Sequence, residues 1–140
     1  MRILLDTCVI SELRKTDIHP RLKELVDMID EENIFISVIS IGELIKGVSL
    51  LDDGQRKREL LSWVGGLERN FADRILGIDQ ETAHIWGEVS AKANKSGKIV
   101  PACDGLIAST ALRHGLHLVT RNTADFTPTA VMLIDPWTSK

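Results

Sequence analysis

Residues 103–126 read CDGLIASTALRHGLHLVTRNTADF, and this stretch decides the fold. Its first part predicts a helix over residues 104–114 that Gly115 stops, since glycine commonly ends a helix. The apolar run 116–119 then predicts a short buried strand, and the polar residues 120–126 predict a loop behind it. A helix followed by a short apolar strand is the building unit of α/β proteins.

The same unit recurs along the chain. Short apolar runs predict further buried strands at residues 3–5, 34–39, 75–78 and 131–134. Apolar residues at helical spacing predict helices at residues 9–14, 21–30, 40–51, 55–69 and 80–95. Ser40 and Glu43 have the spacing of a capping box, which would start the third of these helices. The alternation indicates a single α/β domain over residues 1–140 with a mainly parallel central sheet.

Composition limits the classes of function. The chain is 44% hydrophobic and 26% charged, as in ordinary globular domains. It has no apolar stretch near the ~20 residues of a membrane span, and the first acid comes too early for a signal peptide. The two cysteines lack metal-ligand spacing, so we expect buried free thiols in a reducing, cytoplasmic compartment. A net charge of −3 means that binding to nucleic acid would need local cations or metal ions.

Four acidic residues fall where strands end or helices begin. Asp6 follows the first strand, and Glu43 is one turn into the helix after the second. Asp104 begins the helix of the opening stretch, and Asp125 lies in the loop after its strand. Ligands of open parallel sheets sit at the carboxyl ends of the strands, where a favourable strand order would bring all four acids together.

Each acid also has an ordinary structural explanation. Asp6 and Asp104 fit helix N-caps, worth about 1 kcal/mol each. Glu43 fits the capping box, and Asp125 fits a turn. Clustering them is costly, because two carboxylates ~4 Å apart repel by about 4 kcal/mol at an effective dielectric of 20. A cation would offset that repulsion, and hard oxygen ligands suit Mg²⁺ or Mn²⁺.

Four segments together resemble the PIN-domain family of metal-dependent ribonucleases. They are LLDTCVISEL at 4–13, SVISIGELIKG at 37–47, the opening stretch at 103–126, and DPW at 135–137. The WGEV segment at 86–89 and the Pro-Trp ending are most similar to the FitB-like branch, near the VapC-type toxins of type II toxin–antitoxin pairs. The resemblance covers nearly the whole chain and implies a three-layer α/β/α domain.

The resemblance also implies a catalytic and metal-binding set. Asp6, Glu43, Asp104 and Asp125 match the family's acidic quartet, which holds Mg²⁺ or Mn²⁺ and hydrolyses RNA phosphodiester bonds. Asn122 lies in the same loop as Asp125, and family members differ in which residue of that loop reaches the metal.

Further residues match positions near the pocket. Thr7 and Thr120 either hydrogen-bond the carboxylates or serve as structural strand-end threonines. Lys46 and Arg121 are candidate contacts for the RNA, whereas the basic run at residues 56–58 fits a solvated helix face.

The resemblance implies partners as well: RNA as substrate, and an antitoxin whose DNA-binding N-terminal region precedes a segment that occludes the pocket. It further implies homodimers, and paired dimers in the complex. The helix faces carrying Trp63 and Trp86 fit either an interface or core packing.

Two alternatives stay open. One is a domain that serves mainly in antitoxin binding and operon regulation, with little nuclease activity of its own. The other is a phosphatase with Asp6 as the phosphoryl acceptor, although Cys8 stands where a haloacid-dehalogenase-type phosphatase has its second aspartate.

Overall fold

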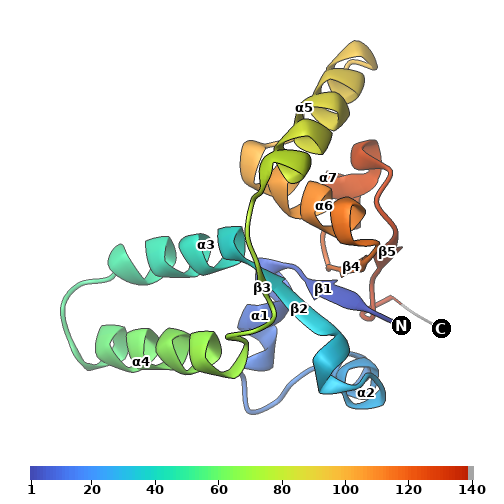
Figure 1. Cartoon of the computed structure of the whole chain (residues 1–140). Helices are drawn as coiled ribbons and strands as arrows, with labels where there is room; N and C mark the ends of the chain where they lie inside the picture. The colour runs from blue at the N-terminus through green and yellow to red at the C-terminus, as the bar shows by residue number, and fades with distance from the viewer. Residues whose placement is uncertain (139–140) are drawn as a thin grey trace.

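The computed structural model describes residues 1–138 and contains a twisted parallel sheet with helices on both faces (Figure 1). The strands are β1 Ile3–Leu5, β2 Ile34–Ser37, β3 Ile75–Leu76, β4 His117–Val119 and β5 Leu133–Ile134. Their order is β3-β2-β1-β4-β5, and every pair is parallel. The predicted α/β fold with a parallel sheet is confirmed.

The helices connect successive strands. They are α1 Thr7–Leu13, α2 Pro20–Met28, α3 Val38–Ser49, α4 Gln55–Asn70, α5 Gln80–Lys95, α6 Ala102–His114 and the short α7 Thr123–Phe126, with single 3-10 turns at η1 Glu31–Asn33 and η2 Thr127–Thr129. Parallel strands need such crossovers, because a short hairpin turn cannot join them.

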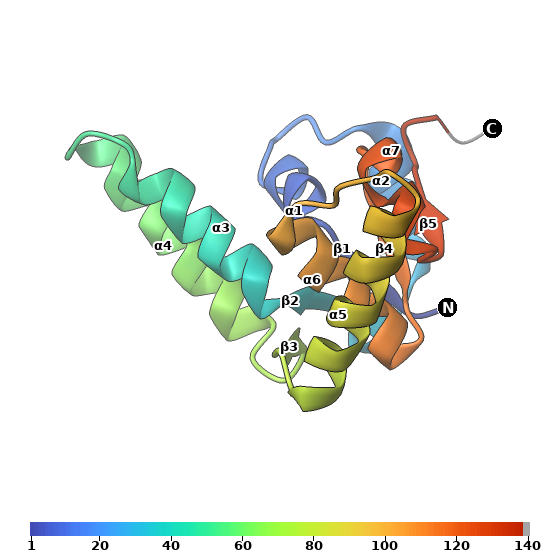
Figure 2. The ribbon, with the colours of Figure 1, turned by 90° about the horizontal axis from the view of Figure 1, so that it is seen from above.

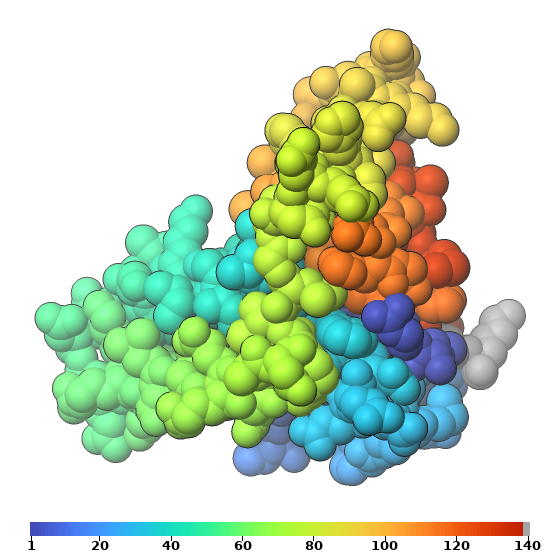
Figure 3. Space-filling model, viewed as in Figure 1, coloured from blue at the N-terminus to red at the C-terminus, as the bar shows by residue number. Residues whose placement is uncertain are grey.

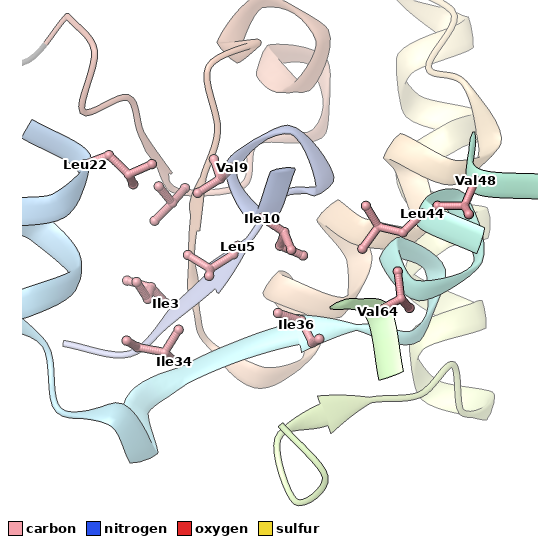
Figure 4. Close-up of a cluster of buried hydrophobic side chains, with 11 residues drawn as sticks. Ile3, Leu5, Val9, Ile10, Leu22, Ile34, Ile36, Leu44, Val48 and Val64 are labelled. Atoms are coloured by element: carbon pink, nitrogen blue, oxygen red, sulfur yellow. The ribbon is translucent and has the colours of Figure 1, made fainter. Parts of the chain in front are cut away.

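The central strand divides the core into two layers. Ile3 and Leu5 point to one face, into a cluster with side chains of α1, α2, α3 and α4 (Figure 4). Leu4 points to the other face, where α6 and α7 cover it. All three side chains are at most 1% exposed. Strands buried on both faces read as continuous apolar runs, which is why these short segments could be recognised in the sequence.

Helices α3 and α4 form a hairpin that extends beyond the edge of the sheet, and we call residues 38–70 the arm (Figure 2). In the space-filling view, the arm and α5 are two projections from the body of the domain (Figure 3). Trp63 of α4 packs partly buried against the first core cluster, and Trp86 of α5 packs against α6. No helix among residues 1–138 combines the length and apolar character needed to cross a membrane.

Three local predictions are wrong. Strand β2 stops at Ser37, whose hydroxyl accepts a hydrogen bond from Ile39 N at 3.0 Å, so α3 begins there and the Ser40–Glu43 capping box does not form. Helix α6 begins at Ala102, so Asp104 is in its first turn and is not the N-cap. The predicted loop 120–126 contains α7.

One expectation about side-chain burial is also wrong. Cys103 is exposed, because it lies on the outer side of the first turn of α6, whereas Cys8 is partly buried. The predicted helix ends are confirmed at Gly97 and Gly115, with left-handed φ values of 77° and 67°.

Candidate functional site: an acidic centre at the sheet edge

The strand order creates a switch point between β1 and β4. From β1 the chain moves outward through β2 to β3, and it then returns to the other side of β1 to form β4. Crossovers on opposite sides of the sheet leave a crevice at the carboxyl ends of these two strands. The Asp6 backbone N–H donates to Val119 O at 2.9 Å and holds the two strand ends together.

Asp6 is held in a fixed orientation at this crevice. It is 5% exposed and is the N-cap of α1, where its Oδ1 accepts from Thr7 N at 2.8 Å. Its Oδ2 accepts from the buried Thr120 hydroxyl at 2.8 Å and from Cys8 Sγ at 3.4 Å. Thr120 Oγ1 in turn accepts from Asn122 N at 3.0 Å, which links the loop after β4 to Asp6. The capping role and a place in the acidic centre are therefore compatible.

Glu43 has hydroxyl support of its own. Thr7 Oγ1 lies 2.6 Å from Glu43 Oε1 and 2.8 Å from Ser40 Oγ. A hydroxyl has only one proton to donate. Thr7 donates its proton to the Glu43 carboxylate, so the Thr7 oxygen accepts a hydrogen bond from the Ser40 hydroxyl. Because Thr7 is at the start of α1, these contacts tie α3 to the end of β1 beside Asp6.

The pKa of the Asp104 carboxyl is raised by burial and by the other three acids. Burial, followed by the negative charges of Asp6, Asp125 and Glu43 in that order, raises its pKa from 3.8 to about 6. No group in residues 1–138 offsets these effects by donating a hydrogen bond to its carboxylate. The four acids, from four separate segments, thus share one electrostatic centre.

Asp125 reaches this centre from α7. It is exposed at the third position of that helix, and its backbone N–H donates to Asn122 O at 3.0 Å. Asn122 precedes α7, and its side chain makes no capping hydrogen bond. Asp125 is therefore the residue of this loop that interacts electrostatically with Asp104, while Asn122 contributes through its backbone.

The donor set has the chemistry of a site for a hard divalent cation. Four carboxylates with the pKa of one of them raised to about 6 carry repulsion that bound Mg²⁺ or Mn²⁺ would relieve. Within residues 1–138, no three His, Cys, Asp or Glu side chains lie close enough to form a ready coordination cluster. Like charges favour such an open arrangement, so these side chains would have to close around an ion.

The two predicted cationic contacts come from the loop after β4 and from α3. Arg121 places its guanidinium over the Trp137 ring, 5.3 Å from the centroid. The pKa of Glu12 on α1 is lowered chiefly by its hydrogen bond with Lys15, and the Arg121 charge makes a smaller contribution. Lys46 is exposed on α3 one turn beyond Glu43. Neither forms an ion pair within residues 1–138.

Sequence reasoning missed three supporting residues. The sequence predicts a capping role for Ser40, whereas its spacing of three from Glu43 places both on one face of α3. The sequence predicts a free thiol at Cys8, and this thiol donates to Asp6. Gly105 permits α5 to approach α6, since a Cβ there would lie 3.0 Å from the Cδ1 and Nε1 atoms of Trp86. No local sequence signal marks that last contact.

The fold and the acidic centre define a class of protein, and comparison with known proteins gives the same class. A family model described as PIN domain matches residues 3–130, so the chain belongs to the PIN-domain family.

Within that family the chain is similar to toxins of toxin–antitoxin pairs, as the sequence resemblance predicted. It is 37% identical to Toxin FitB of Neisseria gonorrhoeae over 96% of this chain and 98% of the relative. It is 32% identical to VapC ribonuclease Y4jK of Sinorhizobium fredii over 96% and 97% of the two chains.

Solved structures show the same relationship. The crystal structure of FitAcB from Neisseria gonorrhoeae aligns with a TM-score of 0.89 and 36% identity, covering 98% of this chain and 99% of the other. A structure of FitAB bound to an IR36 DNA fragment also aligns with a TM-score of 0.89, at 34% identity over 99% and 97%.

Proposed function

We propose that this protein is a Mg²⁺- or Mn²⁺-dependent endoribonuclease that acts as the toxin of a toxin–antitoxin pair. The observation that carries the proposal is the electrostatic coupling of four acids from distant segments at the switch point of a PIN domain. The names of the relatives, VapC ribonuclease and Toxin FitB, support the same activity.

The acidic residues would have different roles in the hydrolysis of the phosphodiester bond. Asp6, Asp104 and Asp125 would hold the cation. When bound, such an ion supplies positive charge to the phosphate and makes water a stronger nucleophile at neutral pH. The Thr120 hydroxyl fixes Asp6, so one ligand is already oriented before the cation arrives.

Glu43 has a different task, because its Oε1 is already held by Thr7. Its Oε2 accepts no hydrogen bond within residues 1–138, which leaves it available to orient the attacking water or accept its proton. The Ser40–Thr7 pair fixes the angle at which Glu43 enters the crevice.

A partner surface supports the toxin assignment. Side chains on the arm remain exposed although they are large and apolar: Val38, Ile45, Leu50, Leu51 and Leu61. Several exposed apolar residues on one projecting element favour a protein interface there. We propose that an antitoxin with a DNA-binding N-terminal region and a second copy of this chain are the protein's partners. The similarity to FitAB, whose solved structure is bound to a DNA fragment, supports a DNA-binding partner.

Cleavage of labelled single-stranded RNA by the purified protein, with Mg²⁺ or Mn²⁺ and with EDTA, tests the proposal. Wild type should cleave only with the metal, and Asp6→Asn should lose at least about a hundred-fold in rate. Glu24→Gln, at an exposed acid on α2, is the matched control and should cleave normally. Equal cleavage by Asp6→Asn and wild type, or no cleavage by wild type, would contradict the proposal.

The alternative role in assembly predicts a different result. Under that alternative, wild type would lack nuclease activity, and Asp6→Asn would bind the antitoxin and operator DNA as wild type does. An active wild-type enzyme with an inactive Asp6→Asn variant that still binds its partners separates the two activities.

A further inference from the structure

A groove opens beside the acidic centre. It has a volume of about 460 Å³ and is bounded by the end of α5, the loop 96–101 and the α7–η2 segment. Figure 2 shows this loop running from the end of α5, past α7, to the start of α6. Asp125 lies on the groove wall, and Pro101 immediately precedes the helix that carries Asp104. The groove therefore shares Asp125 with the acidic centre.

The groove has a cationic side. Lys92 and Lys98 both line it, and neither ammonium group forms an ion pair within the described part of the chain. Asp125 is its one acidic lining residue there. Lysines near a helix C-terminus commonly balance the helix dipole, which accounts for Lys92 at the end of α5. Lys98 lies beyond the helix, so the dipole does not account for it.

The remaining lining is mostly apolar, with hydroxyl groups at Ser96 and Thr127. Ile99 is 89% exposed, and Pro101 and Pro128 lie on the same groove. An exposed isoleucine on the same groove as two unpaired lysines gives an amphipathic surface that suits a ribose and base beside their phosphate. No aromatic residue lines the groove in residues 1–138, so recognition by base stacking is not expected.

We propose that this groove binds a nucleotide of single-stranded RNA next to the scissile phosphate, with Lys92 and Lys98 contacting its phosphate. The inference rests on the proposed ribonuclease function and extends it to a substrate subsite. An RNA strand bound at the acidic centre continues over the surface beside it, where the groove lies. There the unpaired Lys92 and Lys98 provide positive charge for the anionic RNA backbone. The groove then supplies the local cations that a chain of net charge −3 needs.

The test compares Lys92→Gln, Lys98→Gln and the double variant with wild type. Lys95→Gln is the matched control, because this lysine is in the same last turn of α5 and does not line the groove. The substrate is an unstructured RNA roughly ten nucleotides long, within the range of single-strand sites. Steady-state cleavage gives kcat and KM, and fluorescence anisotropy with the labelled RNA gives binding without catalysis.

The proposal predicts a rise in KM and Kd of about five-fold for each single variant, with kcat within two-fold of wild type and a salt slope reduced by about 1 per lysine. Lys95→Gln should match wild type. Unchanged KM and Kd in the double variant would overturn the subsite while leaving the ribonuclease intact. A fall in kcat alone would overturn it too.

Two further outcomes distinguish a failure of the RNA subsite from a failure of the proposed ribonuclease function. If wild type does not cleave RNA, the proposed function fails, and the anisotropy measurement still decides whether the groove binds RNA. If the double variant binds RNA normally but loses binding to a glutamate-rich synthetic peptide, the groove is a protein-docking site, and the RNA subsite is overturned.

Discussion

Replacing Asp104 by asparagine should stabilise the metal-free protein, although the substitution removes a residue of the proposed active centre. The pKa of Asp104 is raised to about 6 by burial and by the charges of Asp6, Asp125 and Glu43. Asparagine has nearly the same shape and cannot ionise. The variant therefore escapes both the desolvation and the repulsion.

The pH dependence follows from the direction of the shift. Well below pH 3.8 the carboxyl is protonated in both the folded and the unfolded protein, so it does not change the free energy of unfolding. As pH rises through 6, the unfolded chain releases this proton more readily than the folded protein does, and stability is lost. Above pH 6 the penalty is complete and constant. The advantage of Asp104→Asn should thus appear between pH 4 and 6.

The magnitude follows from the same values. A pKa of about 6, against an ordinary 3.8, corresponds to at most about 3 kcal/mol of destabilisation. Asp104 is only partly buried, so solvent screening reduces this to about 1–1.5 kcal/mol.

Urea unfolding in EDTA, followed by circular dichroism from pH 4 to 8, measures the difference. Asp17→Asn, at an exposed position before α2, is the control and should stay within about 0.5 kcal/mol of wild type. A variant no more stable than wild type at pH 8, or a gain that is equal at pH 4 and pH 8, would refute the electrostatic coupling of the four acids.

Substitutions at three other positions test the supporting structure by urea unfolding. Gly105→Ala should destabilise by about 1 kcal/mol, because crowding of Trp86 at 3.0 Å outweighs the better helix propensity of alanine; unchanged or greater stability would contradict this. Arg74→Met should lower the free energy of unfolding by about 3 kcal/mol, because the buried guanidinium donates to three backbone carbonyls at 2.7–2.9 Å. A loss below 1 kcal/mol would show that water replaces the guanidinium as the donor to these carbonyls. Thr120→Val should cost about 1–2 kcal/mol by removing a hydrogen bond to Asp6, and Thr120→Ser should restore most of that stability if the hydroxyl matters.

The sequence predicted the elements whose determinants are local. The helix at 80–95 was predicted with the observed bounds, because Asp79 caps it and Ser96-Gly97 ends it. Residues 3–5 were recognisable as a strand because a parallel strand buried on both faces is uniformly apolar. The grouping of the acids followed from one general property, the meeting of parallel strands at their carboxyl ends.

One error is local: Val38 and Ile39 are β-branched and favour a strand, but Ser37 directly before them caps a helix. Other features depend on distant parts of the chain. The role of Ser40 depends on Thr7, thirty-three residues earlier in the chain, so its function was not visible in its own segment. The groove likewise exists only because the loop 96–101 folds beside α7.

The most direct test of the central claim is a calorimetric titration of Mn²⁺ into the purified protein at pH 7.5. If the four acids form one metal centre, wild type should bind Mn²⁺, and Asp6→Asn, Glu43→Gln, Asp104→Asn and Asp125→Asn should each bind it more weakly, by about ten-fold or more for Asp6 and Asp104. Glu24→Gln should bind as wild type does. Absence of Mn²⁺ binding by wild type, or equal affinity in wild type and all four variants, would contradict the claim.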